Sequence, residues 1–267
     1  MTSTLGLIAG KGDLPAIFAR EAKHQGMKVV AITFDKDSEI ITSREADETH
    51  LLGLGQAGKV IKTFHGANIS QIAMIGKIDK RVIFKNMKFD LRALKILNNM
   101  KRKNDDNFML AVVAELESEG FKIINQTAIL KNHMPGAGQF TRRKPTGQEL
   151  EDIRFAMEMA RGIAALDIGQ TVIVKDKAVL AVEAIEGTDE AIERGSLIAR
   201  KGAIVVKVSK PKQDPRFDVP TVGINTVETM ARFNATALAV EAGKTVVVNK
   251  DKMVEICDRH KIAFVAV

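Results

Sequence analysis

The chain opens with Thr4-Leu-Gly-Leu-Ile-Ala-Gly-Lys-Gly-Asp-Leu-Pro15, and this stretch decides the fold of its first half. Thr4–Ala9 is a short apolar run typical of a buried strand, and a glycine-rich turn follows it. A helix is expected next, because Pro15 suits a first helical turn and Gly26 suits a helix carboxyl end. With a second strand at Lys28–Phe34, the sequence predicts a β-turn-α-β unit of the Rossmann type.

The turn is an incomplete version of the dinucleotide-binding fingerprint. Pro15 replaces the third glycine, and Asp13 would place a negative charge beside a pyrophosphate. Asp35 stands where a ribose-binding acid could lie, but a full NAD site is not expected. Instead, a phosphate or sugar is expected to approach the backbone of Gly10 and Gly12, because amides at a helix start bind anions.

The remaining pattern predicts two α/β domains. Apolar strand patterns alternate with helical ones through residues 1–132, which indicates a Rossmann-like domain. Residues 133–146 are rich in glycine and proline and are expected to form a hinge. Residues 147–267 predict a distinct carboxyl-terminal α/β domain that contains a β-hairpin.

A second stretch, Gln213-Asp-Pro-Arg-Phe-Asp-Val-Pro-Thr-Val-Gly223, follows the apolar strand Ala203–Val208. Its prolines exclude a helix interior or a central strand, so we expect a stiff loop at the carboxyl end of a strand. The groups that it offers for chemistry are Asp214, Arg216, Asp218, Thr221 and the backbone of Gly223. The alternative interpretation is a capped surface loop with a local Asp–Arg pair.

Composition excludes several classes of protein. One cysteine, Cys257, rules out a disulfide framework and a Cys/His zinc site. The sequence shows no signal peptide and no apolar run long enough to span a bilayer, so a cytosolic protein is expected. The absence of Trp and Tyr weakens any case for stacking nucleic acid bases.

The positive charge is concentrated in one segment. Residues 77–103 hold ten lysines and arginines against two aspartates. Such a segment favours an anionic membrane surface, nucleic acid or an anionic substrate. The alternative interpretation is a solvated surface of the protein.

Five motifs occur in an order typical of one known family. They are Gly6–Pro15, Asp105-Asp106, Leu166–Gln170, Glu183–Asp189 and Gln213–Gly223. On these motifs, which run nearly end to end, the chain resembles the LpxI family of UDP-2,3-diacylglucosamine pyrophosphatases, enzymes of lipid A biosynthesis in Gram-negative bacteria. The last two motifs are specific to that family.

The resemblance implies an activity and an arrangement. The activity is a Mg²⁺-dependent hydrolysis of the pyrophosphate of UDP-2,3-diacylglucosamine to UMP and 2,3-diacylglucosamine 1-phosphate (lipid X). The arrangement is a Rossmann-like domain and a distinct α/β domain with the lipid between them. The essential aspartate of the family matches Asp218, as metal ligand or as the base that orients water.

The residues suit this chemistry, because pyrophosphate hydrolysis needs charge neutralisation and an oriented water. Asp218 and Asp214 are the candidate catalytic residues, and Asp218, Asp189 and Asp214 are the candidate Mg²⁺ ligands. The residues expected to contact the substrate are Gly10, Gly12, Asp13, Leu14, Lys77, Thr188, Lys207, Arg216, Thr221 and Gly223.

Two other classes of function remain open. The first is a nucleotide-sugar oxidoreductase or transferase, and the second is a non-catalytic protein that binds anionic lipids. For the hydrolase we expect peripheral contact with an anionic membrane, at the cytoplasmic face of the inner membrane, and no nucleic acid partner. A homodimer is left open.

Overall fold

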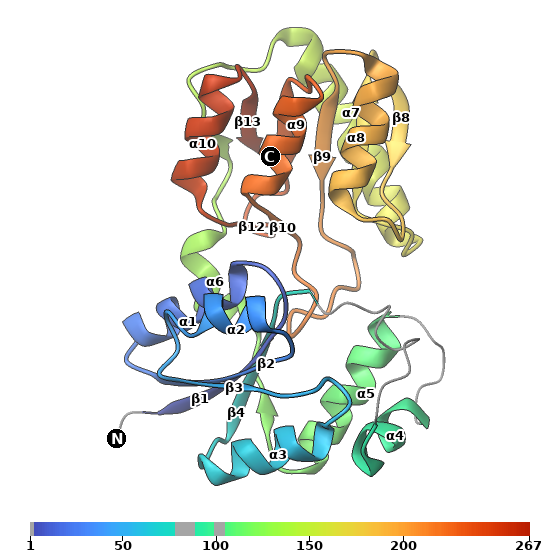
Figure 1. Cartoon of the computed structure of the whole chain (residues 1–267). Helices are drawn as coiled ribbons and strands as arrows, with labels where there is room; N and C mark the ends of the chain where they lie inside the picture. Colours follow the sequence, from blue (N-terminus) through green and yellow to red (C-terminus); the bar gives the residue numbers. More distant parts are fainter. Residues whose placement is uncertain (1–2, 78–88, 99–104) are drawn as a thin grey trace. The chain divides into compact units, whose positions relative to one another are not determined.

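A computed structural model describes residues 3–77, 89–98 and 105–267 of the chain (Figure 1). The chain divides into two compact units, and both combine helices with strands, which confirms the predicted α/β class. The first unit consists of Met1–Leu130 and Pro215–Phe217. The second unit consists of Lys131–Asp214 and Asp218–Val267.

The first unit contains a parallel five-stranded sheet with the order β3-β2-β1-β4-β5, typical of a Rossmann-like half. Its strands are β1 (Thr4–Ala9), β2 (Lys28–Thr33), β3 (Glu48–Leu51), β4 (Gln71–Ile75) and β5 (Lys122–Ile123). Its described helices are α1 (Leu14–His24), α2 (Lys36–Thr42), α3 (Ala57–Gly66), α4 (Leu91–Asn98), α5 (Asp105–Ser118) and α6 (Gln126–Leu130).

The second unit contains a six-stranded sheet with the order β6-β13-β11-β9-β7-β8. Its strands are β6 (Gly138–Gln139), β7 (Thr171–Lys175), β8 (Ala178–Val182), β9 (Ile204–Lys207), β11 (Ala237–Val240) and β13 (Ala263–Ala266). Strands β9, β11 and β13 are parallel, whereas β7 is antiparallel to β9 and forms the predicted hairpin with β8. β6 comes from the stretch expected to be a hinge, and it pairs with β13.

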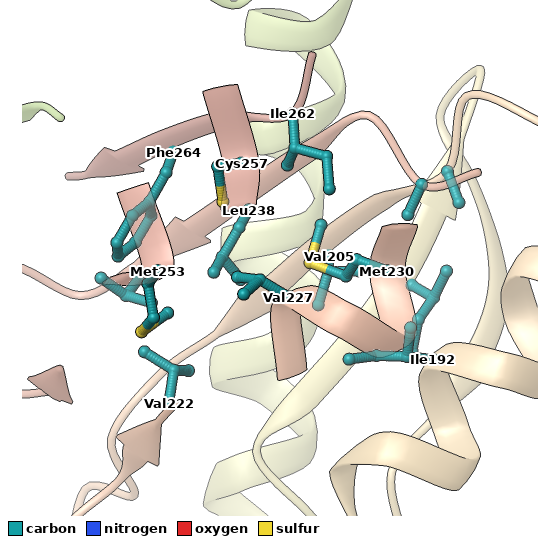
Figure 2. Close-up of a cluster of buried hydrophobic side chains, with 14 of the residues drawn as sticks. Ile192, Val205, Val222, Val227, Met230, Leu238, Met253, Cys257, Ile262 and Phe264 are labelled. Carbon is teal, nitrogen blue, oxygen red and sulfur yellow. The ribbon is translucent and has the colours of Figure 1, made fainter. Parts of the chain in front are cut away.

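Two apolar cores hold this sheet, because successive side chains of a strand point to opposite faces. The helices of the second unit are α7 (Gly147–Ala165), α8 (Thr188–Ala199), α9 (Ile224–Arg232) and α10 (Lys250–Arg259). Helix α7 packs its alanine-rich side on one face, and α8, α9 and α10 pack on the other. Figure 2 shows the core between the sheet and helices α8, α9 and α10, where Met230 and Met253 lie near Val205, Leu238 and Phe264 of the sheet.

The structure differs from expectation at the end of the proline-containing loop. Residues Thr221–Val222 form a short strand, β10, which pairs with β12 (Val246–Val247) in a separate two-stranded sheet. Strand β12 is thus short and does not join the main six-stranded sheet. Pro220 O accepts a hydrogen bond from Val246 N at 2.8 Å, which extends this pairing.

Helix α8 packs unusually close to the hairpin, and this generates a prediction. A Cβ added at Gly195 would lie 2.7 Å from Cβ of Ile173 and 3.0 Å from Cβ of Ala181. Gly195→Ala is therefore expected to lower the free energy of unfolding by about 1–3 kcal/mol, although alanine favours helices. Gly162 of α7 is the control, since a Cβ there meets no atom within 4 Å.

Gly162→Ala is expected to raise the free energy of unfolding by up to about 1 kcal/mol. Urea unfolding followed by circular dichroism measures both variants. Equal stabilisation by the two substitutions would show that α8 does not need a glycine at this contact.

Candidate functional site

The candidate site begins with the edge of the second sheet where β9, β11 and β13 end, which we call the carboxyl edge. Lys207 is the last residue of β9, and Glu241 directly follows β11. Strand β8 also ends at this edge, just before Glu183, because it is antiparallel to β7 and β7 is antiparallel to β9. Ligands of α/β proteins commonly bind at the carboxyl ends of strands, so this edge is the place where a site is expected.

Lys207 and Thr188, both predicted to contact substrate, touch each other at this edge. Lys207 Nζ donates to Thr188 Oγ1 at 2.7 Å, and Thr188 Oγ1 donates to Glu183 Oε1 at 2.8 Å. Lys207 is only 5% exposed and Thr188 only 7%. Sequence reasoning selected the lysine and the threonine as substrate contacts, whereas it named Glu183 only as part of the Glu183–Asp189 motif.

Asp218, the candidate catalytic residue, lies beside a lysine that the sequence analysis did not select. Lys210 Nζ is 3.5 Å from Asp218 Oδ2 and 2.7 Å from Asp167 Oδ1. Asp218 N also donates to Asp214 O at 2.9 Å, so the two candidate aspartates share one turn of the loop. The sequence could have indicated Lys210 only by its position, as a basic residue between β9 and the loop.

The middle of the loop, Pro215–Phe217, belongs to the first unit. Pro215 O accepts a hydrogen bond from Gln126 N at 3.0 Å, and Phe217 packs against the apolar core of that unit. Arg216 Nη1 lies 3.0 Å from Glu117 Oε1 of α5. The guanidinium predicted to bind phosphate therefore forms an ion pair within the first unit.

The glycine turn of the first unit is tied to β4. Gly10 N donates to Ile75 O at 2.7 Å, and Lys11 N donates to Lys77 O at 2.7 Å. A Cβ at Gly10 would lie 2.6 Å from Lys77 O, so only glycine fits. The amide of Gly10 is thus used by a hydrogen bond within the fold. Gly12 has a positive φ of 97°, and a Cβ added there would have no atom within 4 Å.

The neighbouring predicted residues lie at helix starts. Leu14 begins α1, and the Asp13 side chain before it makes no capping hydrogen bond. Asp35, placed where a ribose-binding acid could lie, caps α2 by accepting from Ser38 N at 2.9 Å. This capping role gives Asp35 a structural function in the fold.

Three further predicted residues lie at helix starts or in β10 of the second unit. Asp189 is in the first turn of α8, and Gly223 is the residue before α9. Thr221 lies in β10, and its hydroxyl donates to Val219 O at 3.1 Å.

No ready-made metal cage is present in residues 3–77, 89–98 and 105–267: no group of three or more His, Cys, Asp or Glu side chains is placed to hold a metal. The predicted ligands Asp189, Asp214 and Asp218 do not form one. Mg²⁺, however, is often held by one or two carboxylates together with water and substrate phosphates. Asp214 and Asp218, in one turn of the loop, suit such a partial set of ligands.

Glu241 is a buried carboxylate at the carboxyl edge. It accepts hydrogen bonds from Ser209 N at 3.0 Å and Ser209 Oγ at 2.7 Å, and it contacts Lys244 Nζ at 3.0 Å. Burial alone would raise its pKa, but the bonds from Ser209 and Lys244 outweigh burial and lower the pKa to about 2. Glu241 therefore holds the residue that precedes Lys210.

Cys257 is not part of this site. It is fully buried within the core of Figure 2, and burial raises the pKa of its thiol to about 12. A thiol with such a pKa is inert as a nucleophile.

Comparisons with known proteins cover nearly the whole chain. Residues 4–133 match the model described as the LpxI N-terminal domain, and residues 136–265 match the LpxI C-terminal domain. A relative from Caulobacter vibrioides, named UDP-2,3-diacylglucosamine pyrophosphatase LpxI, is 32% identical and covers 95% of this chain and 94% of its own length.

The likeness to solved structures is slight. The biotin carboxylase domain of Hydrogenobacter thermophilus 2-oxoglutarate carboxylase is 15% identical with a TM-score of 0.31, over 75% of this chain and 41% of that structure. N5-carboxyaminoimidazole synthetase of Staphylococcus aureus with ADP is 16% identical with a TM-score of 0.29, over 72% and 35%. This chain spans less than half of either structure, and such scores carry no inference about fold or activity.

The low pKa of Glu241 predicts how stability depends on pH. Its pKa is about 2 in the folded chain against an ordinary 4.5, so its contribution is complete above pH 4.5 and disappears as the pH falls towards 2. That contribution is at most about 3 kcal/mol. Glu241→Gln should therefore be clearly less stable than the parent at pH 7, with a gap that closes as the pH falls towards 2.

Chemical unfolding at a series of pH values measures this gap. Glu255→Gln is the control, because it makes the same change at an exposed carboxylate of α10. A gap between Glu241→Gln and the parent that stays constant from pH 7 to pH 3 would contradict the assignment.

Proposed function

The chain belongs to the LpxI family and is a hydrolase, and from this membership we propose that it cleaves the pyrophosphate of UDP-2,3-diacylglucosamine. The products are UMP and 2,3-diacylglucosamine 1-phosphate, and the step belongs to lipid A synthesis. The observation that carries the proposal is 32% identity to a pyrophosphatase of this name over 95% of the chain. The lysines and aspartates of the second unit support it, since phosphoryl chemistry depends on such charges.

Within this proposal, the residues of the carboxyl edge have separate roles. Asp218 orients or deprotonates the attacking water, and Lys210, 3.5 Å away, holds its carboxylate in place. Lys207 binds a phosphate oxygen from the end of β9. Bound Mg²⁺, held by Asp218 with Asp214 or Asp189, would neutralise charge on the pyrophosphate.

We also propose that the glycine turn of the first unit binds an anionic group. Gly12 and the first turn of α1 have backbone groups that suit an anion, while the Gly10 backbone shapes the turn. Asp13, Leu14 and Lys77 flank this turn.

Asp218→Asn tests the proposal. The amide keeps the shape of the side chain but can neither take a proton nor bring a negative charge, so the rate of UMP release should fall about 10²–10⁴-fold. Release of UMP from UDP-2,3-diacylglucosamine, measured by chromatography with and without a chelator, gives the rate. Circular dichroism confirms that the variant is folded.

The matched control is Asp251→Asn, which changes an exposed aspartate of α10 in the same way and should keep the parental rate. A folded Asp218→Asn protein with parental turnover would refute the role of Asp218. A parental protein that releases no UMP would refute the proposed function itself.

We also propose peripheral contact with an anionic membrane surface, since a diacylated substrate lies in a bilayer. The described part of the chain contains no helix that is long and apolar enough to cross a membrane. Much of the basic segment 77–103 lies outside the described residues. Of its described members, Arg92 and Lys95 pair with Glu115 of α5, so those two charges are already partly neutralised.

The remaining charges yield a prediction. Replacement of Lys101, Arg102 and Lys103 by Gln should weaken binding to vesicles containing phosphatidylglycerol about tenfold or more at low salt, because each charge contributes roughly 1 kcal/mol near the surface. Co-sedimentation at several salt concentrations measures the binding. Gln at the exposed residues Lys131, Lys201 and Lys252 is the control, and equal effects of the two triple variants would remove the special role of the segment.

A further inference from the structure

Three polar residues form one row across the end of the second sheet. Thr171 of β7 is the register partner of Lys207 of β9. On the other side of β7, Glu183 N donates to Thr171 O at 2.9 Å, one step beyond the pair Val172–Val182. Neighbouring residues in register point to the same face of a sheet, so Glu183, Thr171 and Lys207 share a face. We call these three the edge row.

Helix α8 covers this face and begins over the edge row. Ile173 follows Thr171 by two positions in β7, and Val205 precedes Lys207 by two positions in β9. Both lie in the core that α8 contacts, on the same face as the edge row. The close contact at Gly195 fixes the position of α8 on the hairpin, and Thr188 is its first residue. The hydroxyl of Thr188 is thereby held between Glu183 and Lys207.

The direction of the two hydrogen bonds is fixed by chemistry. An ammonium only donates, so Lys207 Nζ gives a hydrogen to Thr188 Oγ1 at 2.7 Å. The single hydrogen of Thr188 is then left for Glu183 Oε1 at 2.8 Å. A carboxylate that accepts this hydrogen turns the lone pairs of the hydroxyl towards the lysine. Glu183, Thr188 and Lys207 are therefore linked by two consecutive hydrogen bonds.

Because these polar side chains are buried, their arrangement lowers the stability of the fold. Glu183 Oε2 and Thr171 Oγ1 are both buried, and neither has a hydrogen-bond partner among the residues that the structure describes. Groups of this kind destabilise a fold, and where they persist they commonly have a functional reason. This loss of stability therefore points to a role for the hydrogen-bonded side chains in ligand binding.

We propose that Glu183 is a positioning residue: through the hydroxyl of Thr188 it holds the ammonium of Lys207 at the carboxyl edge, where Lys207 binds a phosphate oxygen of the substrate. The inference rests on the function proposed above. Glu183 itself does not touch the substrate in this scheme. Its effect passes through the two hydrogen bonds that join Glu183, Thr188 and Lys207.

A double-mutant cycle tests the proposal. Glu183→Leu and Thr188→Val each break the hydrogen-bond connection between Glu183 and Lys207. Each should lower kcat/KM for UMP release about 10- to 100-fold in the parental protein. In a Lys207→Met background the same substitutions should change kcat/KM less than twofold, because the group that they position is gone. Thr188→Ser keeps the hydroxyl and should recover most of the activity.

Binding of inorganic pyrophosphate, measured by calorimetry, gives a readout that does not depend on turnover. Glu183→Leu, Thr188→Val and Lys207→Met should weaken it by similar factors, whereas Glu193→Gln, an exposed change on α8, should not. If the parental protein released no UMP but this pattern held, the proposed function would fail and the positioning role would stand.

A purely structural role for Glu183 gives a different pattern. Glu183→Leu would then lower the melting temperature and change kcat/KM by the same factor with Lys207 and with Met at that position. Pyrophosphate affinity of the folded protein would also stay at the parental value. Either result overturns the proposal.

Discussion

The close packing of α8 on the β7–β8 hairpin is the constraint on which the second unit depends. No side chain fits at Gly195, so the helix axis approaches the strands more closely than a larger residue would permit. The start of the helix is then fixed over the end of the sheet, and Thr188 reaches Lys207 there. The geometry of the carboxyl edge thus depends directly on the packing of the core.

Electrostatic contacts extend this arrangement to the proline-containing loop. Glu241, at the end of β11, holds Ser209 by two hydrogen bonds, and the next residue, Lys210, contacts Asp218 and Asp167. The low pKa of Glu241 means that this anchor is charged throughout the neutral range. The position of Asp218 therefore depends on a strand that is distant in the sequence, which no local pattern reveals.

The sequence predicted those features that depend on neighbouring residues. The alternation of strands and helices, the hairpin and the glycine turn after β1 follow from local periodicity and from Gly and Pro placement. Three features did not follow, because each depends on long-range packing. These are the pairing of Gly10 N with Ile75 O, the insertion of Pro215–Phe217 into the first unit, and the ion pair of Lys210 with Asp218.

The two lysines of the carboxyl edge differ in burial, and this decides what each can do. The Lys210 side chain is 21% exposed between carboxylates that are themselves partly in water, so screening keeps its pairs weak and exchangeable. Lys207 is only 5% exposed and is oriented by a buried hydroxyl, so water screens it little and does not easily replace its partner. A weakly held lysine can change its position and partners, whereas a rigidly held one presents a fixed charge. The carboxyl edge therefore combines one positive charge that is fixed by burial with one that can move with its partners.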